Sequence, residues 1–318
     1  MTPTRRHSLA LLGAAAIAPA MAPRTAAAPR HHYDLTPLPV AQGVWMIEGS
    51  TDYFSDANGG AIVNCVLLDS DAGMIIVDTG PSLRYGEALR LVAEGLTGKG
   101  IAAIINTHHH PDHYFGNQAF ANLPIYGLPR MASLAVQHGD GFADNMYRIL
   151  GDWMRGTEPV PPNRLIDGAT LNIGGRRLDL LPLSGHTEAD LTLIDSRTGT
   201  AIAGDLAFLD RAATTPNADL ALWRDALDFI AAANPAAIIP GHGPIDPTGA
   251  SLTQTRGYLD WLEVTLTEAA HSGLDMVEVM GLPIPPEHAA LGAMPEEFFR
   301  SVSHLFPAIE LTALPLSD

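Results

Sequence analysis

The chain has 318 residues, with 18 Lys+Arg against 35 Asp+Glu and a formal net charge of −17. Its hydrophobic fraction of 47% excludes wholesale disorder, and its length allows one large domain or two modest ones. The acidic balance and the lack of Lys/Arg clusters argue against a nucleic-acid partner. A single cysteine excludes an internal disulfide and a Cys-rich zinc site. Thirteen histidines are unusually many, so their positions matter most.

The first 28 residues have the composition of an export signal. Arg5 and Arg6 precede an apolar stretch over residues 9–22, and alanine-rich sequence follows. The stretch of about 14 residues is too short to span a bilayer comfortably, but it suits the centre of a signal peptide. The paired arginines resemble a twin-arginine signal. We therefore predict that residues 1–28 are removed on export, leaving a periplasmic protein, residues 29–318, with no membrane span.

The mature chain alternates apolar runs with helical patterns. The elements expected first are a strand at 44–48, a hairpin of 61–69 and 74–78, a helix from Ser82 to about 97, a strand at 101–106 and a helical stretch at 131–154. Those expected later are strands at 177–183, 191–194 and 200–203, a helix at 219–233, a strand at 236–239 and helices from 248 onward. This order predicts an α+β domain over 29–318, with two mixed sheets, outer helices and a helical C-terminal segment from about 250. Cys65 falls in an apolar run and is expected to be a small buried hydrophobe.

Four polar clusters each follow an apolar strand. They lie at residues 106–113, 184–187, 204–205 and 240–244. Imidazole and carboxylate groups are ligands of borderline divalent cations. His108 and His110 are two apart in extended chain and can point the same way. Asp112 and His113 follow a proline-set turn, so this one loop offers two ligand pairs.

The later clusters also have simpler interpretations when each is taken alone. His186 and His242 would be structural histidines, and Asp205 would be a helix N-cap. All four clusters at strand ends, in this order, favour a metal site instead. Asp205 is placed to lie between two cations and offset their repulsion. His109 points away from its neighbours by strand alternation, which indicates a residue beside the site rather than a ligand.

The pattern His108-x-His110-x-Asp112-His113, with three further ligand types downstream, resembles the metallo-β-lactamase fold hydrolases over roughly residues 35–250. The resemblance implies an αββα sandwich holding two zinc ions, with iron or manganese left open. It implies a first ion on His108, His110 and His186, a second on Asp112, His113 and His242, and Asp205 as the bridge. Asp78 matches the early aspartate of the family, which lies beside the ligands, and a helix cap is the alternative.

The chemistry implied by this resemblance is hydrolysis. A hydroxide shared by two metal ions, oriented by Asp112 as the catalytic residue, would attack an ester, thioester or amide bond of a small molecule. Asn58, Gly59, Gly60 and Trp45 lie in early segments that are expected to border the substrate pocket, with turn and core positions as the alternative.

Several flanking segments carry a narrower likeness. They are residues 58–60, 78–82, 106–108, 116–120, 186–191 and 203–206. They resemble the SoxH-type exported metallohydrolases, which include the quinoprotein relay system zinc metallohydrolases associated with PQQ-dependent dehydrogenases. This likeness implies a periplasmic dehydrogenase as partner.

Other activities stay open beside this one. Asp205 stands where class B β-lactamases have a cysteine ligand, which disfavours those enzymes but leaves lactam cleavage by another ligand set. Glyoxalase II shares the ligand set, but its basic C-terminal region is lacking, since residues 250–318 hold two arginines and no lysine. Persulfide dioxygenases use one iron. A non-catalytic periplasmic metal-binding accessory protein is the alternative from another class.

Overall fold

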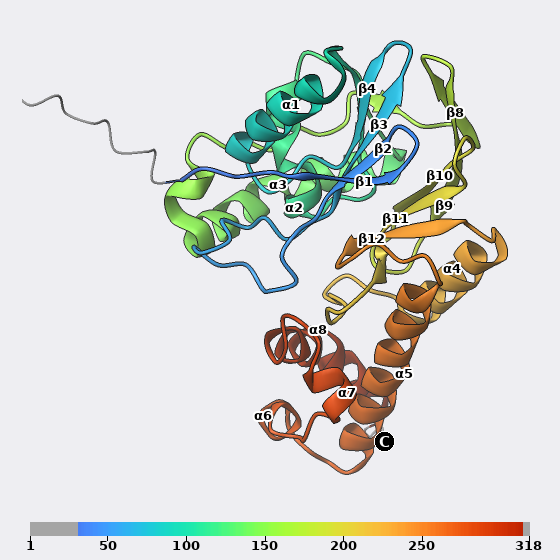
Figure 1. Cartoon of the computed structure of the whole chain (residues 1–318). Coiled ribbons are helices and arrows are strands. Elements are labelled where there is room, and N and C mark those ends of the chain that lie inside the picture. The colour runs from blue at the N-terminus through green and yellow to red at the C-terminus, as the bar shows by residue number, and fades with distance from the viewer. Residues whose placement is uncertain (1–30, 314–318) are drawn as a thin grey trace, which may run out of the picture. The chain divides into compact units, whose positions relative to one another are not determined.

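Two β-sheets lie face to face in residues 31–313, the part of the chain that the computed structural model describes (Figure 1). The signal predicted at 1–28 lies outside the described residues. The first sheet has seven strands in the order β1 to β7, and the second has five in the order β12-β11-β10-β9-β8. Both sheets are mixed, because β4 to β7 and the pair β11–β12 are parallel while the other neighbours are antiparallel.

The elements are as follows. The first sheet contains β1 (Pro37–Ala41), β2 (Val44–Ile47), β3 (Cys65–Ser70), β4 (Gly73–Val77), β5 (Ile101–Ile105), β6 (Ile125–Gly127) and β7 (Arg164–Leu165). The second contains β8 (Thr170–Ile173), β9 (Arg176–Leu183), β10 (Asp190–Asp195), β11 (Thr200–Phe208) and β12 (Ala237–His242). The helices are α1 (Leu83–Thr97), α2 (Pro111–Tyr114), η1 (Phe115–Phe120), α3 (Pro129–Leu150), η2 (Gly151–Met154), α4 (Leu220–Ala232), α5 (Ala250–His271), α6 (Met276–Met280), α7 (Pro286–Ala289) and α8 (Glu296–Ala313).

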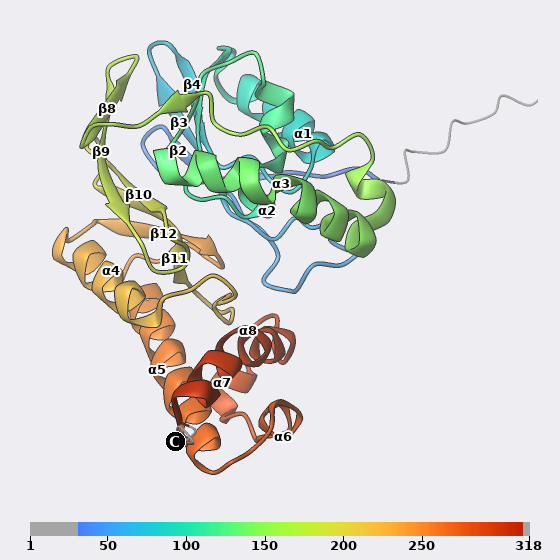
Figure 2. The same ribbon diagram turned by 180° about the vertical axis from the view of Figure 1, so that it is seen from behind.

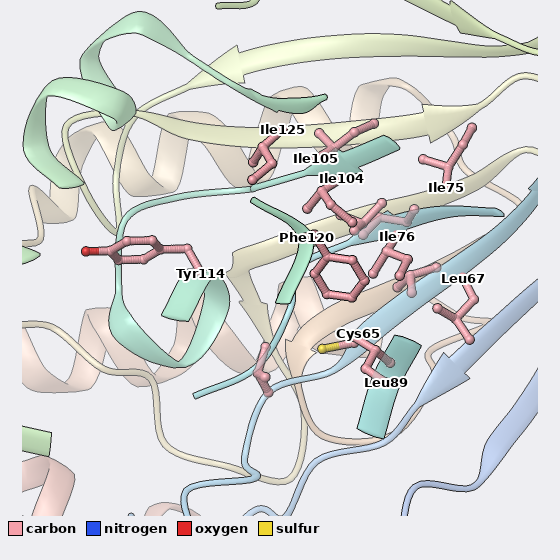
Figure 3. Close-up of a cluster of buried hydrophobic side chains, with 14 of the residues drawn as sticks. Cys65, Leu67, Ile75, Ile76, Leu89, Ile104, Ile105, Tyr114, Phe120 and Ile125 are labelled. Carbon is pink, nitrogen blue, oxygen red and sulfur yellow. The ribbon is translucent and has the colours of Figure 1, made fainter. Parts of the chain in front are cut away.

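An apolar core fills the space between the two sheets. Leu67 and Ile104 come from the first sheet and Leu193 from the second, and all three are fully buried in one cluster. Cys65 lies in the same core, as expected, among aliphatic side chains that include Leu89 of α1 (Figure 3). Burial raises the pKa of the Cys65 thiol well above its usual value. The apolar area removed from water is what holds the two sheets together.

Helices cover the outer faces of both sheets (Figures 1 and 2). On the first sheet α1 packs against β4 and β5, and on the second α4 and α5 pack against β11. A second apolar cluster joins that sheet to the C-terminal helices through Trp223, Leu259 and Phe298. This layering confirms the predicted α+β sandwich. Within residues 31–313, none of the helices is both long enough and apolar enough to cross a membrane.

Local signals in the sequence explain where two of the long helices begin. Ser82 is the N-cap of α1, and its hydroxyl accepts a hydrogen bond from Tyr85 N at 3.2 Å. Asp219 caps α4 in the same way, by accepting from two backbone amides. The sequence pattern does not predict β1, β6, β7 and β8. Three of these are edge or near-solvent strands with exposed positions, so their burial periodicity is weak.

Candidate metal centre

Seven buried side chains converge where strands of both sheets end. They come from the loop after β5, from α2, from the loop after β9, from β11 and from the end of β12: His108, His110, Asp112, His113, His186, Asp205 and His242. Their ligand atoms form two groups, and within each group all atoms lie within 4.8 Å of one another. The first group is His108, His110, His186 and Asp205, and the second is Asp112, His113 and His242. The structure thus brings together all seven side chains that the sequence singled out as ligands.

Asp205 lies within a strand rather than after one. The sequence pattern predicted a strand ending at residue 203, but β11 continues to Phe208. Gly204 has a φ of +55°, and the register between β11 and β12 shifts on both sides of it, so the strand bulges at this point. A Cβ at Gly204 would lie 2.9 Å from the Thr107 Cβ. Glycine therefore allows β11 to approach the loop that carries His108 and to aim Asp205 at the cluster.

The Asp205 carboxylate reaches both ligand groups. In the first group, its Oδ2 lies 3.3 Å from His186 Nε2 and 3.9 Å from His108 Nε2. In the second group, the same oxygen lies 3.2 Å from His242 Nε2, and Oδ1 lies 3.1 Å from His113 Nε2. Asp205 is therefore in position to bridge two cations and offset their mutual repulsion.

Hydrogen bonds on the outer side of two imidazoles set their orientation. His110 Nε2 lies 2.9 Å from Asn217 Oδ1, and His242 Nδ1 lies 2.7 Å from the Ile62 carbonyl. Because both partners are oxygen acceptors, those two nitrogens carry the hydrogen. The opposite nitrogens, His110 Nδ1 and His242 Nε2, are left with a lone pair that faces the cluster.

Asp78 orients a third imidazole from a strained backbone position. It follows β4 with a φ of +59°, which is uncommon for a residue other than glycine. Its carboxylate accepts hydrogen bonds from Thr107 N at 2.9 Å, Thr107 Oγ1 at 2.7 Å and His113 Nδ1 at 2.7 Å. Asp78 therefore lies beside the ligands, and Ser82 rather than Asp78 caps the following helix.

The cluster contains buried polar atoms that a cation would satisfy. In residues 31–313, His108 Nε2, His113 Nε2 and Asp205 Oδ1 make no hydrogen bond, although the last two atoms lie 3.1 Å apart. His110 Nδ1 and His186 Nε2 also converge, at 2.8 Å. Buried polar groups of this kind are normally paired, and imidazole nitrogen and carboxylate oxygen are the donors that zinc takes. The residues present therefore fit a dinuclear metal site.

The protonation of the cluster is shaped by burial and by the carboxylates. Burial lowers the pKa of His108 and His186 well below the usual value, so both imidazoles are neutral, which is the form that binds metal. Burial also acts on His113, but neighbouring carboxylates, led by Asp205, outweigh it and raise the pKa of His113 well above the usual value. A cation that binds the second group would therefore displace a proton from His113.

His109 lies next to the cluster but outside both ligand groups. Its ring is buried, 5.1 Å from the ring of His110 and 5.8 Å from that of His138. Burial, with a smaller contribution from His110, lowers the pKa of His109 to about 2, so this imidazole is neutral. Its position agrees with the strand alternation that separated it from its neighbours in the sequence.

A cavity of about 490 Å³ opens onto the ligands. Four cluster residues line it: His110, Asp112, Asp205 and His242. The opposite walls come from the loop after β2, from α3, from the segment after β11 and from α8. This volume suits a small molecule, and the lining is partly apolar, as is usual for such pockets.

Four residues that were expected to border the pocket do not line this cavity: Trp45, Asn58, Gly59 and Gly60. Trp45 lies on β2 and pairs with β1. Gly59 has a φ of +58° and packs beneath Trp153, where a Cβ would lie 2.6 Å from the indole ring. Asn58 Nδ2 donates to the Tyr53 carbonyl at 2.8 Å. Asn58 and Gly59 therefore shape the loop, and the residues of this loop that line the cavity are Tyr53, Phe54 and Ile62.

Several residues of the site carried no signal in the sequence. Tyr53, Phe142, Arg211, Asn217 and Arg300 line the cavity from four separate segments. They do not repeat with any period, and none belongs to the polar clusters at strand ends. Only the packing of distant segments brings them to the ligands.

Comparison with known proteins places the fold and the site in a family. A family model described as "Metallo-beta-lactamase superfamily" matches residues 58–242. The chain is similar to a "Linear primary-alkylsulfatase" of a Pseudomonas species, with 23% identity over 285 residues, which is 75% of this chain and 53% of that protein. It is also similar to a "Beta-lactamase-like protein 2 homolog" of Caenorhabditis elegans, with 28% identity over 191 residues, 57% of this chain and 56% of that protein. The chain thus spans little more than half the length of these two curated relatives.

Solved structures show the same fold. The metallo-β-lactamase FIM-1 from Pseudomonas aeruginosa, in its mono-zinc form, superimposes with a TM-score of 0.59 at 20% identity, covering 72% of this chain and 96% of that one. The metallo-β-lactamase from Pontibacter korlensis gives a TM-score of 0.57 at 20% identity, covering 71% and 99%. At these identities the likeness concerns the fold and not the substrate.

Proposed function

The chain belongs to the metallo-β-lactamase superfamily, and on that premise we propose that it is an exported metal-dependent hydrolase of an ester, thioester or amide bond in a small molecule. The observation that carries this proposal is the pair of buried His/Asp groups joined by Asp205 at a cavity of substrate size. Lactam cleavage belongs to the same reaction class.

The ligand groups assign the residues that would hold the metals. His108, His110 and His186 would hold one ion, Asp112, His113 and His242 the other, and Asp205 would lie between them. Divalent ions at these positions supply Lewis acidity and lower the pKa of a water. The donor set favours zinc, while iron and manganese accept the same ligands.

Asp112 is the residue placed to handle the proton. Its Oδ2 lies 3.5 Å from His242 Nε2 and 3.6 Å from His113 Nε2, and the side chain lines the cavity. As the water oxygen bonds to the acyl carbon, an Asp112 carboxylate oxygen would accept the proton. The bond to the leaving oxygen, sulfur or nitrogen then breaks, and the proton passes to that leaving group.

Metal analysis joined to a hydrolysis panel tests this proposal. The panel comprises thioesters, lactones, β-lactams and a primary alkyl sulfate, the last because one relative is named an alkylsulfatase. We expect two zinc ions per chain, with both metal and turnover lost in His186→Ala and Asp205→Ala. His271→Ala, an exposed histidine at the end of α5, is the matched control and should retain both.

Two outcomes would contradict the proposal. One iron per chain with oxygen uptake would indicate an oxygen-consuming enzyme. Bound metal without turnover on any substrate would favour the metal-binding accessory protein.

Export and partnership form a second part of the proposal, supported by sequence features alone. We propose that residues 1–28 direct twin-arginine export to the periplasm, and that the protein works beside a PQQ-dependent dehydrogenase system. The support is the Arg5-Arg6 pair before an apolar stretch, and the flanking segments that resemble those of the quinoprotein relay group. Replacing both arginines with lysine should retain the protein in the cytoplasm of a fractionated host, and unchanged export would argue against this route.

Co-elution with PQQ-dependent dehydrogenase activity from periplasmic extract would support the partner, whereas separate elution would count against it.

A further inference from the structure

Two arginines line the cavity of a strongly acidic protein. Arg211 follows β11 and Arg300 lies on α8, drawn red in Figure 1, and both line the same cavity as the metal-cluster residues. Arg211 is only 2% exposed, whereas the Arg300 side chain is 33% exposed. Among the described residues, the acidic side chains that line this cavity are Asp112 and Asp205, and both belong to the metal cluster. The two arginines thus give this wall of the cavity positive charge, although the chain as a whole is acidic.

One carboxylate serves both guanidinium groups. Glu297 is fully buried, and its Oε1 lies 3.3 Å from Arg211 Nη2. Arg300 Nη1 lies 3.2 Å from the same oxygen and 3.1 Å from Oε2. Arginine stays charged in proteins, so two positive charges share one negative charge. In residues 31–313, Nε and Nη1 of Arg211 have no hydrogen-bond partner. Two guanidinium groups and one carboxylate leave this wall with a net positive charge, which favours an anion as ligand.

Arg300 is held in a geometry that presents it to a ligand. Its guanidinium lies over the Tyr53 ring at 5.5 Å from the centroid, and Glu297 binds it from one turn earlier on α8. Among the described residues, Arg300 binds Glu297 through Nη1 alone. Its Nε and Nη2 atoms are therefore available to bind another partner. The planar guanidinium matches two oxygens of a carboxylate or a sulfate.

The other residues that line the cavity indicate what the rest of the ligand is like. Phe54, Phe142, Met146 and Pro216 line the same cavity with apolar surface. We propose that Arg300, backed by the charge of Arg211, binds an oxyanionic group of the substrate, either a carboxylate or a sulfate, while an apolar part of the substrate fills the cavity beside the metal cluster. This inference rests on the proposed function, because it names the substrate class of the same site. The scarcity of basic residues after position 250 does not weigh against it, since one arginine at the cavity is enough.

Calorimetric titration of the purified full chain tests the anion site without any turnover. The probes are hexyl sulfate, hexanoate and the neutral hexan-1-ol, which share one apolar chain. Loss of a charge-assisted pair should weaken binding of the anions to Arg300→Gln by roughly 10- to 100-fold and leave hexan-1-ol unchanged. Arg300→Lys should recover part of the affinity. The stronger of the two anions indicates whether a sulfate or a carboxylate is the natural group.

Arg256→Gln is the matched control. Arg256 lies on α5, pairs with Asp228 outside the cavity and undergoes the same change of charge. It should bind all three probes as the unmodified protein does. Equal weakening of anions and alcohol in Arg300→Gln, or equal loss in Arg256→Gln, would overturn the inference.

Ester kinetics separate this inference from the proposed function. With mono-4-nitrophenyl glutarate, Arg300→Gln should raise KM about tenfold or more with little change in kcat. With the neutral 4-nitrophenyl acetate, both constants should stay the same. If both esters lose rate equally, Arg300 is not an anion site although the protein is a hydrolase. If neither ester is cleaved by the unmodified protein, the hydrolase proposal fails for esters, and the calorimetric result decides the anion site independently.

Discussion

Replacing Asp246 with asparagine should destabilise the segment that follows β12. Asp246 Oδ1 accepts hydrogen bonds from Thr248 N at 2.8 Å, Thr248 Oγ1 at 3.0 Å and Gly249 N at 2.9 Å. Its Oδ2 accepts from Ser251 N at 2.7 Å and Ser251 Oγ at 2.6 Å. The Asp246 backbone also exchanges two hydrogen bonds with Ile238 of β12. In asparagine, an NH2 group replaces one of the two oxygens and would face N–H and O–H donors that it cannot accept from. The substitution would also remove the charge that strengthens all five bonds.

The size of the effect follows from the pKa of this carboxyl. Burial would raise it, but the hydrogen bonds, led by those from Ser251, outweigh burial and lower the pKa of Asp246 from 3.8 to about 2. This lowering corresponds to an upper limit of about 2.5 kcal/mol in the free energy of unfolding. Because asparagine keeps one side-chain oxygen that can still accept part of these hydrogen bonds, we expect a loss of about 1–2 kcal/mol. Because the folded pKa is the lower one, the stabilisation is fully present above pH 4 and is lost as the pH falls toward 2.

Urea unfolding at pH 7 and pH 3, followed by circular dichroism, measures this effect. Asp246→Asn should lower the free energy of unfolding by about 1–2 kcal/mol at pH 7 and by about half as much at pH 3. Asp144→Asn, an exposed aspartate on α3, is the matched control and should change stability by less than about 0.5 kcal/mol. A loss no larger than that of the control at pH 7, or one of equal size at both pH values, would refute the reasoning.

Three further substitutions test other parts of the structure. Asp78→Asn removes the full charge that orients His113, so metal affinity measured by chelator competition should fall about 10- to 100-fold, and unchanged affinity would contradict this role. Ser82→Ala removes the N-cap of α1 and should cost about 1 kcal/mol in urea unfolding, whereas no loss would mean that another group caps the helix. Phe120→Ala should cost about 3–5 kcal/mol because the ring is fully buried, while Phe229→Ala, at an exposed ring, should cost far less.

Four of the seven ligand residues could be recognised in the sequence because they are close together in the chain. His108, His110, Asp112 and His113 lie within six residues of one another, in the loop after a buried strand and the short helix α2, so their spacing alone puts four donors close together. The α+β class was readable for a similar reason, since apolar runs and capping residues such as Ser82 act within a few residues. Edge strands such as β1 were missed because solvent exposure removes the periodic pattern.

The tertiary structure alone decided how distant segments meet. Asp205 reaches both ligand groups because β11 bulges at Gly204, and no local pattern announced that bulge. Trp45 and Asn58 lie in early segments that were expected to border the pocket, but neither lines the cavity: Trp45 lies on β2, and Asn58 binds the Tyr53 carbonyl within the loop.

The sequence by itself therefore determined the donor types, the layered fold and the family resemblance, all of which depend on local pattern. Only the packing of the chain decided which cationic side chain lies near those donors. Arg300 lines the cavity because α8, a helix that comes after the last strand of the sandwich, packs beside it. Burial of apolar surface is non-directional and acts on whole faces of helices and strands. It therefore brings particular side chains of distant segments together only in the complete tertiary structure.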